Sequence, residues 1–212
     1  MSVQSFPLDD RGSFAWLAED GLDRASCALA LDGGCVVVDP VDVPGLDRTL
    51  GPLGPVLGVA TLLDRHQRDA ALVAGRHAAP RLTPAALGGG VRLPGIEERT
   101  VTDRRGWHEA LLWLPDRRLL VCVETLGAGR FYLARADDRL GIHPLNRLRV
   151  PRRAFEGLEP AVIAFGHGPP LREDAPEELR RVLARARRDL PRAWLGTAAA
   201  AFRTLRQSRK DR

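Results

Sequence analysis

The sequence predicts an α/β protein whose sheets contain both parallel and antiparallel strands. Short apolar runs alternate along the chain with segments of helical periodicity, and several runs are joined by tight turns of the hairpin type. Hairpins produce antiparallel pairs, whereas strands connected through helices produce parallel ones, so both kinds are expected. The 212 residues, 44% of them hydrophobic, suffice for one domain with a sizeable core.

The first half of the chain contains a hairpin, a strand and a helix. Residues 26–40 (SCALALDGGCVVVDP) read as two apolar strands joined by a DGG turn, where glycine supplies the positive φ that a tight turn needs. The D-P pair ends the second strand, because proline cannot continue a ladder of hydrogen bonds. Residues 55–61 predict a short buried strand, and residues 69–79 predict a compact helix that ends near Pro80.

The second half repeats the same kinds of element. Residues 109–127 predict a strand, a turn at a Pro-Asp pair and a second strand. Residues 161–171 read as a buried strand that runs into a loop rich in glycine and proline. Two helices are expected after it, over residues 174–190 and 191–206, the first with an apolar stripe at helical spacing.

The positive charge is concentrated near the end of the sequence. The net charge of +5 comes almost wholly from arginine, since Lys210 is the only lysine. We expect one domain over residues 1–200 and a basic, disordered tail over residues 201–212. Acidic residues precede the arginine-rich helices, and aromatic residues do not interleave with the arginines as a stacking platform would need, which favours a solvated helix face. Nucleic-acid binding through these basic C-terminal helices is therefore the weakest functional alternative.

The compartment is predicted from what the sequence contains and lacks. Cys27, Cys35 and Cys122 are an odd number of widely spaced cysteines in apolar runs, which indicates structural thiols in a reducing compartment. The sequence has no N-terminal segment of secretory type and no apolar run approaching ~18 residues. A cytoplasmic location without membrane insertion is the expectation.

The most informative segment is the polar loop LLDRHQRDA, residues 62–70, between a predicted strand and a predicted helix. Together with the preceding VVVDP, the later hairpin ALLWLP…RRLLVCVETL and the GHG of residues 166–168, its order resembles the metallo-β-lactamase superfamily. The resemblance covers roughly residues 25–190. It implies a four-layer αββα sandwich with mixed sheets and a dinuclear metal site along one edge.

That family carries a loop of the form T-H-x-H-x-D-H, which this chain matches best with Arg68 and Asp69 on the x-D step. The first two histidine positions then fall on Arg65 and Gln67, and the last on Ala70. Arginine is a permanent cation, glutamine is a poor ligand and alanine is none, so the resemblance implies that this half of the site is empty. In this register His66 occupies a position that holds no ligand.

The remaining positions of the family pattern fall in the second half of the chain. The later histidine position falls near Arg105, close to His108, the acidic position falls on Glu124, and the final histidine is His167. The second metal position thus keeps Asp69, Glu124 and His167, an O,O,N set that can hold one catalytic ion in principle. The expected cofactor is none, or a single zinc, manganese or iron ion; dinuclear zinc is not expected.

Without a metal cluster, Asp69 and Glu124 would repel each other unless they are paired or protonated. Three arginines, Arg65, Arg68 and Arg105, are the expected ion-pairing residues, with an Arg65–Glu124 pair as one replacement for metal. Two histidines, His66 and His108, are candidate catalytic residues, as auxiliary ligand or base. Two others, His77 and His143, are expected at the surface.

Three functional hypotheses follow. The leading one is a metallo-β-lactamase-fold protein with a degenerate active site, a pseudoenzyme without dinuclear zinc hydrolase activity that keeps a polar cleft for a small anion or a partner. The alternative is a mononuclear metal-dependent hydrolase that uses Asp69, Glu124 and His167. Nucleic-acid binding is the weaker third. The substrate, the identity of a small-molecule or protein partner, and the oligomeric state are not predicted, because fold alone does not fix chemistry.

Overall fold

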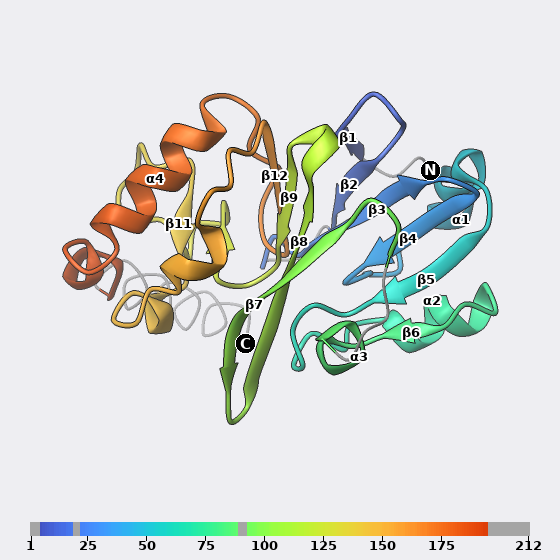
Figure 1. The fold of residues 1–212 in the computed structure, drawn as a ribbon, viewed down its shortest axis with the longest axis horizontal. Coiled ribbons are helices and arrows are strands. Elements are labelled where there is room, and N and C mark those ends of the chain that lie inside the picture. The colour runs from blue at the N-terminus through green and yellow to red at the C-terminus, as the bar shows by residue number, and fades with distance from the viewer. Residues whose placement is uncertain (1–4, 19–21, 89–92, 195–212) are drawn as a thin grey trace, which may run out of the picture.

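Two β-sheets packed face to face form the centre of the molecule in a computed structural model that describes residues 5–18, 22–88 and 93–194 (Figure 1). The first sheet has the strand order β1-β2-β3-β4-β5-β6, and the second has the order β12-β9-β8-β7. The strands of the first sheet are β1 (Ser5–Pro7), β2 (Phe14–Leu17), β3 (Ala25–Leu31), β4 (Gly34–Val38), β5 (Val56–Ala60) and β6 (Arg81–Leu82). Those of the second are β7 (Glu97–Arg104), β8 (Trp107–Leu114), β9 (Leu119–Cys122) and β12 (Val162–Phe165), while β10 (Leu126–Gly127) and β11 (Gly141–Ile142) form a separate ribbon.

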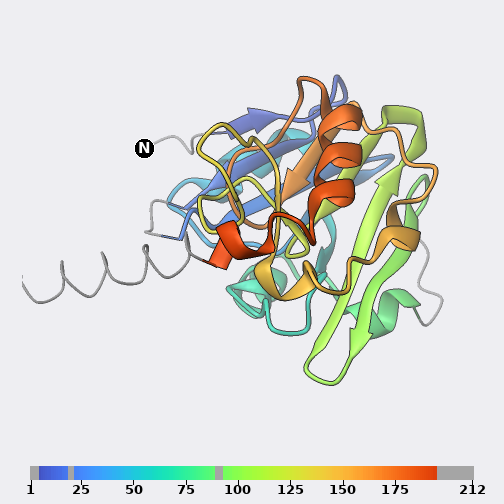
Figure 2. The same ribbon diagram turned by 90° about the vertical axis from the view of Figure 1, so that its left-hand side faces the viewer.

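Helices cover the outer faces of both sheets. The α-helices are α1 (Leu46–Leu50), α2 (Ala70–Arg76), α3 (Pro84–Gly88) and α4 (Ala175–Arg185). Short 3-10 turns are η1 (Gly51–Leu53), η2 (Pro115–Arg117), η3 (Pro144–Asn146) and η4 (Arg152–Phe155). Helices α1 and α2 pack on the first sheet and α4 packs on the second, so the layers are helix, sheet, sheet and helix (Figures 1 and 2). This is the four-layer sandwich that the sequence predicts.

The alternation of side chains along each strand explains why the central strands read as continuous apolar runs. On β4, Val36 and Val38 face the core between the sheets, whereas Val37 faces the helices. On β8, Leu112 belongs to the core between the sheets and Leu111 to the core under α4. Because both faces of these strands are covered, both sets of alternating residues must be apolar.

The sheets are mixed, as the sequence predicts. Strand β4 pairs in parallel with β5, β5 with β6, and β9 with β12, while the other pairs of the two large sheets are antiparallel. The predicted hairpin closes with Leu31 opposite Gly34, and Gly33 has a φ of +86°. The prediction did not include β1, β2 and β7. The first two are short, and β7 (EERTVTDR) is an edge strand whose polar residues give no apolar alternation.

Several further expectations can be compared with the structure. Cys27, Cys35 and Cys122 are buried free thiols. No helix in the described residues is long and apolar enough to cross a bilayer. The predicted basic tail, residues 201–212, and most of the helix predicted over residues 191–206 lie outside the described residues; residues 190–194 are helical.

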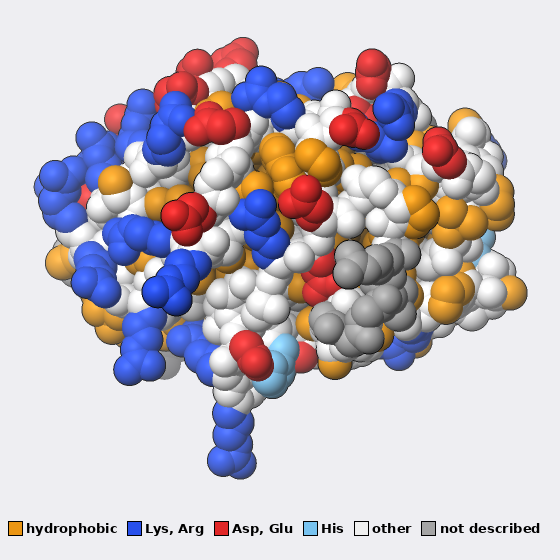
Figure 3. Space-filling model, in the orientation of Figure 1, with side chains coloured by type: hydrophobic (Ala, Val, Ile, Leu, Met, Phe, Trp, Pro, Cys, Tyr) orange, Lys and Arg blue, Asp and Glu red, His pale blue; other side chains and the backbone are white. Residues whose placement is uncertain are grey.

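Basic side chains are frequent on the part of the surface that α4 contributes (Figure 3). On this helix Arg180 forms ion pairs with Glu159 and Glu177, and Arg181 pairs with Glu178. Carboxylates therefore neutralise these two arginines locally, which is the arrangement expected of a solvated helix face.

Candidate metal centre

Four strands end at one edge of the two sheets, and each leads to a polar residue of one cluster. Asp39 follows β4, His66 lies in the loop after β5, Glu124 follows β9 and His167 follows β12. Because β4 is parallel to β5 and β9 is parallel to β12, the carboxyl ends of each pair lie side by side. Loops beyond the carboxyl ends of parallel strands commonly form the binding sites of open α/β sheets.

Backbone hydrogen bonds join the two sheets at this edge. Ala25 donates its N–H to the carbonyl of Gly166 at 2.8 Å, and Ala110 donates to Leu62 at 2.9 Å. These bonds connect the start of β3 with the loop after β12, and β8 with the loop after β5. The loops that carry the polar residues are therefore fixed relative to one another.

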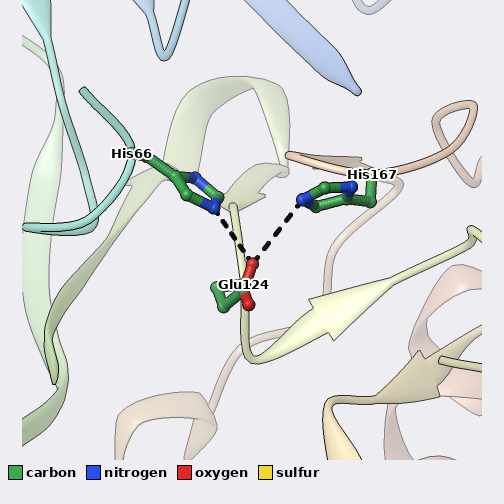
Figure 4. A group of neighbouring side chains, drawn as sticks. All are labelled: His66, Glu124 and His167. Carbon is green, nitrogen blue, oxygen red and sulfur yellow. Dashed lines mark ion pairs between the residues drawn. The ribbon is translucent and has the colours of Figure 1, made fainter. Parts of the chain in front are cut away.

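The carboxylate of Glu124 lies at the centre of the cluster, with an imidazole on either side (Figure 4). From its Oε2, Nε2 of His66 is 3.1 Å away and Nε2 of His167 is 3.7 Å away. The ligand atoms of these three residues all lie within 4.8 Å of one another, and the described part of the chain contains no other group of three such side chains placed to hold a metal ion. The site is an N,N,O set of largely buried donors.

His66 is oriented by Asp39. Its Nδ1 lies 2.6 Å from Oδ2 of Asp39, whose Oδ1 accepts the backbone N–H of Leu62 at 2.9 Å. Burial lowers the pKa of His66, but its hydrogen bonds with Asp39 and Glu124 outweigh burial and raise that pKa to about 9. Without a metal ion, His66 is therefore an imidazolium between two carboxylates at neutral pH.

His167 is oriented by a backbone carbonyl. Its Nδ1 lies 3.0 Å from the carbonyl oxygen of Leu22, which can only accept, so Nδ1 carries the proton. Burial lowers the pKa of His167, so this imidazole is neutral and its Nε2 presents a lone pair. That lone pair faces the carboxylate of Glu124 at 3.7 Å, beyond hydrogen-bonding distance.

Further donors converge on Glu124. The hydroxyl of Tyr132 donates to Oε2 at 3.0 Å, and Nε2 of His143 lies 3.4 Å from Oε1. Burial raises the pKa of Glu124, but the hydrogen bond and charge of His66, with smaller effects of the other two histidines, lower it to about 2. Burial raises the pKa of Tyr132 and lowers that of His143 to about 4, so both are neutral donors at neutral pH.

The donor set fits a divalent metal ion. Two neutral imidazoles and a carboxylate are ordinary zinc ligands, and three protein ligands leave a coordination position open. Metal-binding histidines usually donate their other ring N–H to a carboxylate or a backbone carbonyl. Asp39 supplies the carboxylate to His66, and Leu22 supplies the carbonyl to His167. The lone pair on Nε2 of His167 faces the carboxylate of Glu124, and a cation bound between the two would interact favourably with both.

A buried carboxylate fixes the backbone next to Glu124. Glu109 is 1% exposed, and its Oε1 accepts the N–H groups of Glu124 at 3.0 Å and of Thr125 at 2.7 Å. Its Oε2 accepts the hydroxyl of Thr125 at 2.6 Å and Nε1–H of Trp107 at 3.1 Å. These donors lower the pKa of Glu109, but burial outweighs them and raises it above its usual value. One side chain thus holds both the Glu124 loop and the indole of Trp107.

The structure separates the three arginines that the sequence groups together. Arg65 lies over the indole of Trp107, with its guanidinium carbon 4.3 Å from the ring centroid, and Glu124 has His66 as its short ion-pair partner. Arg105 is exposed in the turn between β7 and β8.

Arg68 crosses between the sheets. Its guanidinium donates to the backbone carbonyls of Ala25, Asp39 and Gly166. Arg68 has a positive φ of 37°, and burial lowers the pKa of its side chain. Its charge also lowers the pKa values of His66 and His167, so it acts on the site as a fixed cation behind the histidines.

Asp69 and His108 lie apart from the N,N,O group. The carboxylate of Asp69 accepts the N–H of Asp42 at 2.8 Å, and Asp69 precedes the first residue of α2. Nδ1 of His108 lies 2.5 Å from Oδ1 of Asp103, and both side chains are more than half exposed. Of the sequence-derived candidates, the structure brings His66, Glu124 and His167 together.

The prediction that His143 lies at the surface was wrong. This residue is 8% exposed, and its ring packs against Trp107, Phe131 and Tyr132 with centroid separations of 4.9 to 5.9 Å. Its burial comes from Trp107 on β8 and from Phe131 and Tyr132 in the loop between β10 and β11. The residues next to His143 in the sequence do not show these contacts. Asp39, Tyr132 and Glu109 were also not predicted as site residues.

Comparison with solved structures places this architecture. The chain aligns with the DIM-1 metallo-β-lactamase at a TM-score of 0.60 and 12% identity, over 91% of this chain and 99% of that one. A metallo-β-lactamase from Hirschia baltica aligns at a TM-score of 0.60 and 10% identity, over 90% of this chain and 98% of that one. The chain has the metallo-β-lactamase fold.

A third structure with this fold is described as a mono-zinc form. It is an NDM/FIM-1-like metallo-β-lactamase from Erythrobacter litoralis, which aligns at a TM-score of 0.58 and 13% identity over 91% of this chain and 96% of that one. No protein-family model matches the sequence, and no curated protein matches it. The likeness therefore establishes the fold, and the chemistry has to be argued from the site.

Proposed function

We propose that the protein is a hydrolase that uses one divalent metal ion, held by His66, Glu124 and His167. The observation that carries the proposal is the orientation of the two imidazoles. Each has Nδ1 held by a protein acceptor and Nε2 directed at the carboxylate of Glu124. This differs from the set expected from the sequence, because His66 takes the place of Asp69. Zinc, manganese and iron are the candidate ions, since imidazole and carboxylate ligands suit all three.

When bound, such an ion supplies Lewis acidity and a source of hydroxide near neutral pH. The chain's own residues prepare the site for it. His66 releases its Nε2 proton to become a ligand, while Asp39 keeps the Nδ1 proton in place. The hydroxyl of Tyr132 donates to Oε2 of Glu124, and Nε2 of His143 lies 3.4 Å from Oε1, so polar groups face both oxygens of this carboxylate. While His66 is protonated, the pKa of Glu124 is about 2, so this carboxylate is ionised and is a poor general base.

A metal-free binding protein with a degenerate site is the second candidate, and one observation favours it. Nε2 of His66 lies 3.1 Å from Oε2 of Glu124, and the pKa of His66 is about 9. A proton on His66 then supplies the positive charge that a metal ion would otherwise supply. In that case the site binds a ligand without hydrolysing it.

Metal analysis of protein purified without chelator separates the two candidates. The proposal predicts about one equivalent of divalent metal in the wild type and less than about a tenth of that in H66A and H167A, as expected when one of three ligands is lost. His77 also forms an Asp–His pair, with Asp47, at 3.0 Å, so H77A is the matched control and keeps the wild-type metal content. Metal-free wild-type protein that stays metal-free after incubation with zinc, manganese and iron would favour the degenerate site.

Activity is the second half of the test. The proposal predicts hydrolysis of p-nitrophenyl acetate or p-nitrophenyl phosphate that is lost on dialysis against a chelator and restored by adding the metal back. Protein that retains one equivalent of metal but hydrolyses neither ester would contradict the hydrolytic part of the proposal.

A further inference from the structure

A single indole near the metal centre carries two guanidinium groups. The guanidinium carbons of Arg65 and Arg104 lie 4.3 Å and 4.8 Å from the ring centroid of Trp107. The two carbons are therefore less than about 10 Å apart, which is within one Debye length at 0.1 M salt. Like charges at this separation repel each other, and contact with the ring face offsets part of that repulsion.

These two charges have no anionic partner within the described part of the chain. Neither Arg65 nor Arg104 forms an ion pair there, and both residues are exposed. The polar side-chain contact of Arg104 is with the neutral amide of Asn146, at 2.9 Å. Arg76 provides the contrast, since its guanidinium binds both oxygens of Asp42 at 2.8 Å.

The indole fixes the two guanidinium groups beside the metal centre. Nε1–H of Trp107 donates to the buried carboxylate of Glu109, which holds the ring. The ring packs against the imidazole of His143 with a centroid separation of 4.9 Å, and Nε2 of that histidine lies 3.4 Å from Glu124. One imidazole thus separates the indole from the central carboxylate, and Arg65 directly precedes His66 in the chain.

Apolar side chains lie at the same place. Phe131 is 43% exposed, and its ring centroid lies 5.2 Å from that of His143. Leu145 is 53% exposed, and its N–H donates to Nδ1 of His143 at 3.2 Å. Two residues with exposed, large hydrophobic side chains therefore contact the imidazole of His143, Phe131 through its ring and Leu145 through its backbone.

We propose that Arg65 and Arg104 bind the phosphoryl group of an organic phosphate monoester, with its apolar group against Phe131 and Leu145. Two unneutralised cations match a dianion better than a monoanion, and guanidinium groups bind phosphate oxygens in a planar, bidentate manner. In the hydrolysis of such an ester, the oxygen of water forms the new P–O bond, the ester P–O bond breaks, and the leaving alcohol takes the proton. The inference that the ester is a substrate rests on the proposed hydrolytic function, whereas the inference that the ester binds at Arg65 and Arg104 does not.

The test is calorimetric titration of metal-free protein with phenyl phosphate, with benzoate as the monoanionic comparator. We expect R65Q and R104Q each to weaken phenyl phosphate binding about tenfold or more, the effect of losing a charge-assisted hydrogen bond. R48Q is the charge-matched control, since Arg48 is exposed on α1, and it should stay within about twofold of the wild type. We expect benzoate to bind more weakly than phenyl phosphate in the wild type.

Wild-type affinity for phenyl phosphate in both arginine variants would overturn the inference, as would benzoate binding as tightly as phenyl phosphate. Binding to H167A separates the two proposals. Suppose that phenyl phosphate binds H167A and that this binding depends on Arg65, while wild-type protein contains no metal and hydrolyses no ester. This result would support the phosphate-binding site and contradict the proposed hydrolase.

Discussion

Replacing Asp39 with asparagine changes the tautomer of a metal ligand with little change in volume. In the wild type, Oδ2 of Asp39 accepts Nδ1–H of His66 at 2.6 Å, so Nε2 is the nitrogen that binds metal once its proton is released. An asparagine that keeps its oxygen on the N–H of Leu62 places its NH₂ group against Nδ1. Nδ1 must then accept, so the one ring proton of the variant sits on Nε2. Ligation then requires removal of a proton from a neutral imidazole, whereas the wild type releases it from an imidazolium that keeps its Nδ1 proton on Asp39. Asp39 has a φ of +45°, a conformation that asparagine adopts readily, so little backbone strain is added.

The expected magnitude follows from the loss of a group that orients a ligand. Such changes typically reduce metal affinity about 10- to 100-fold, or roughly 1.4–2.7 kcal/mol. Zinc affinity would be measured by competition with a chelating dye, and the tautomer of His66 by long-range ¹H–¹⁵N NMR of the zinc-free protein. D47N removes a second Asp–His pair, that of Asp47 with His77, and should leave zinc affinity unchanged.

Two results would refute this reasoning. One is D39N protein that unfolds at the wild-type temperature and binds zinc within about twofold of wild-type affinity. The other is an NMR spectrum in which Nδ1 of His66 remains protonated in the folded variant. If D39N protein fails to fold, D39E takes its place: this variant keeps a carboxylate acceptor, so Nδ1 of His66 should stay protonated.

Three further predictions follow from the same contacts. In metal-free protein, the contacts of protonated His66 with Asp39 and Glu124 should add about 3 kcal/mol to the free energy of unfolding between pH 4.5 and 6.5. This contribution is lost as the pH rises through about 9, where His66 loses its proton, and as the pH falls through about 2, where Glu124 gains one. The difference in the free energy of unfolding between wild type and H66Q, from urea denaturation across pH, measures it, and a difference that does not change with pH would contradict it. E109Q should lower the free energy of unfolding by about 1–3 kcal/mol, because the NH₂ group of the glutamine would meet the N–H and O–H donors that the carboxylate accepts. E98Q is the control and should not lower it. Equal urea midpoints for the two variants would contradict a stabilising role of the Glu109 carboxylate. R68M should lower the free energy of unfolding by about 3 kcal/mol or more, because three hydrogen bonds from a charged donor to backbone carbonyls are lost, whereas R48M should lower it little. A thermal midpoint of R68M equal to that of R48M would show that this cross-link contributes nothing.

The fold could be predicted from the sequence because the buried strands carry their own signal. The run GCVVV of β4 is buried on both faces and ends at a D-P pair, and the hairpin before it closes at a glycine with positive φ. Neither feature depends on residues elsewhere in the chain. The edge strand β7 was missed because half of its residues face solvent and give no apolar pattern.

The site could be predicted only in part, because its loops are positioned by contacts distant in sequence. The sequence identified Glu124 and His167, which lie in the loops just after two buried strands. It placed Asp69 in the ligand set because the motif was aligned on the Arg68–Asp69 step. In the structure the loop turns at Arg68, whose guanidinium binds three carbonyls of the two sheets, and His66 points at Glu124. No local pattern contains those contacts.

The most direct measurement is anomalous X-ray scattering from crystals of protein purified without chelator, collected on both sides of the zinc, iron and manganese absorption edges. The account predicts one anomalous peak within about 2.0–2.2 Å of Nε2 of His66, Nε2 of His167 and a carboxylate oxygen of Glu124. Crystals soaked in zinc that show no peak among these three residues, or a peak ligated by Asp69 in place of His66, would contradict it.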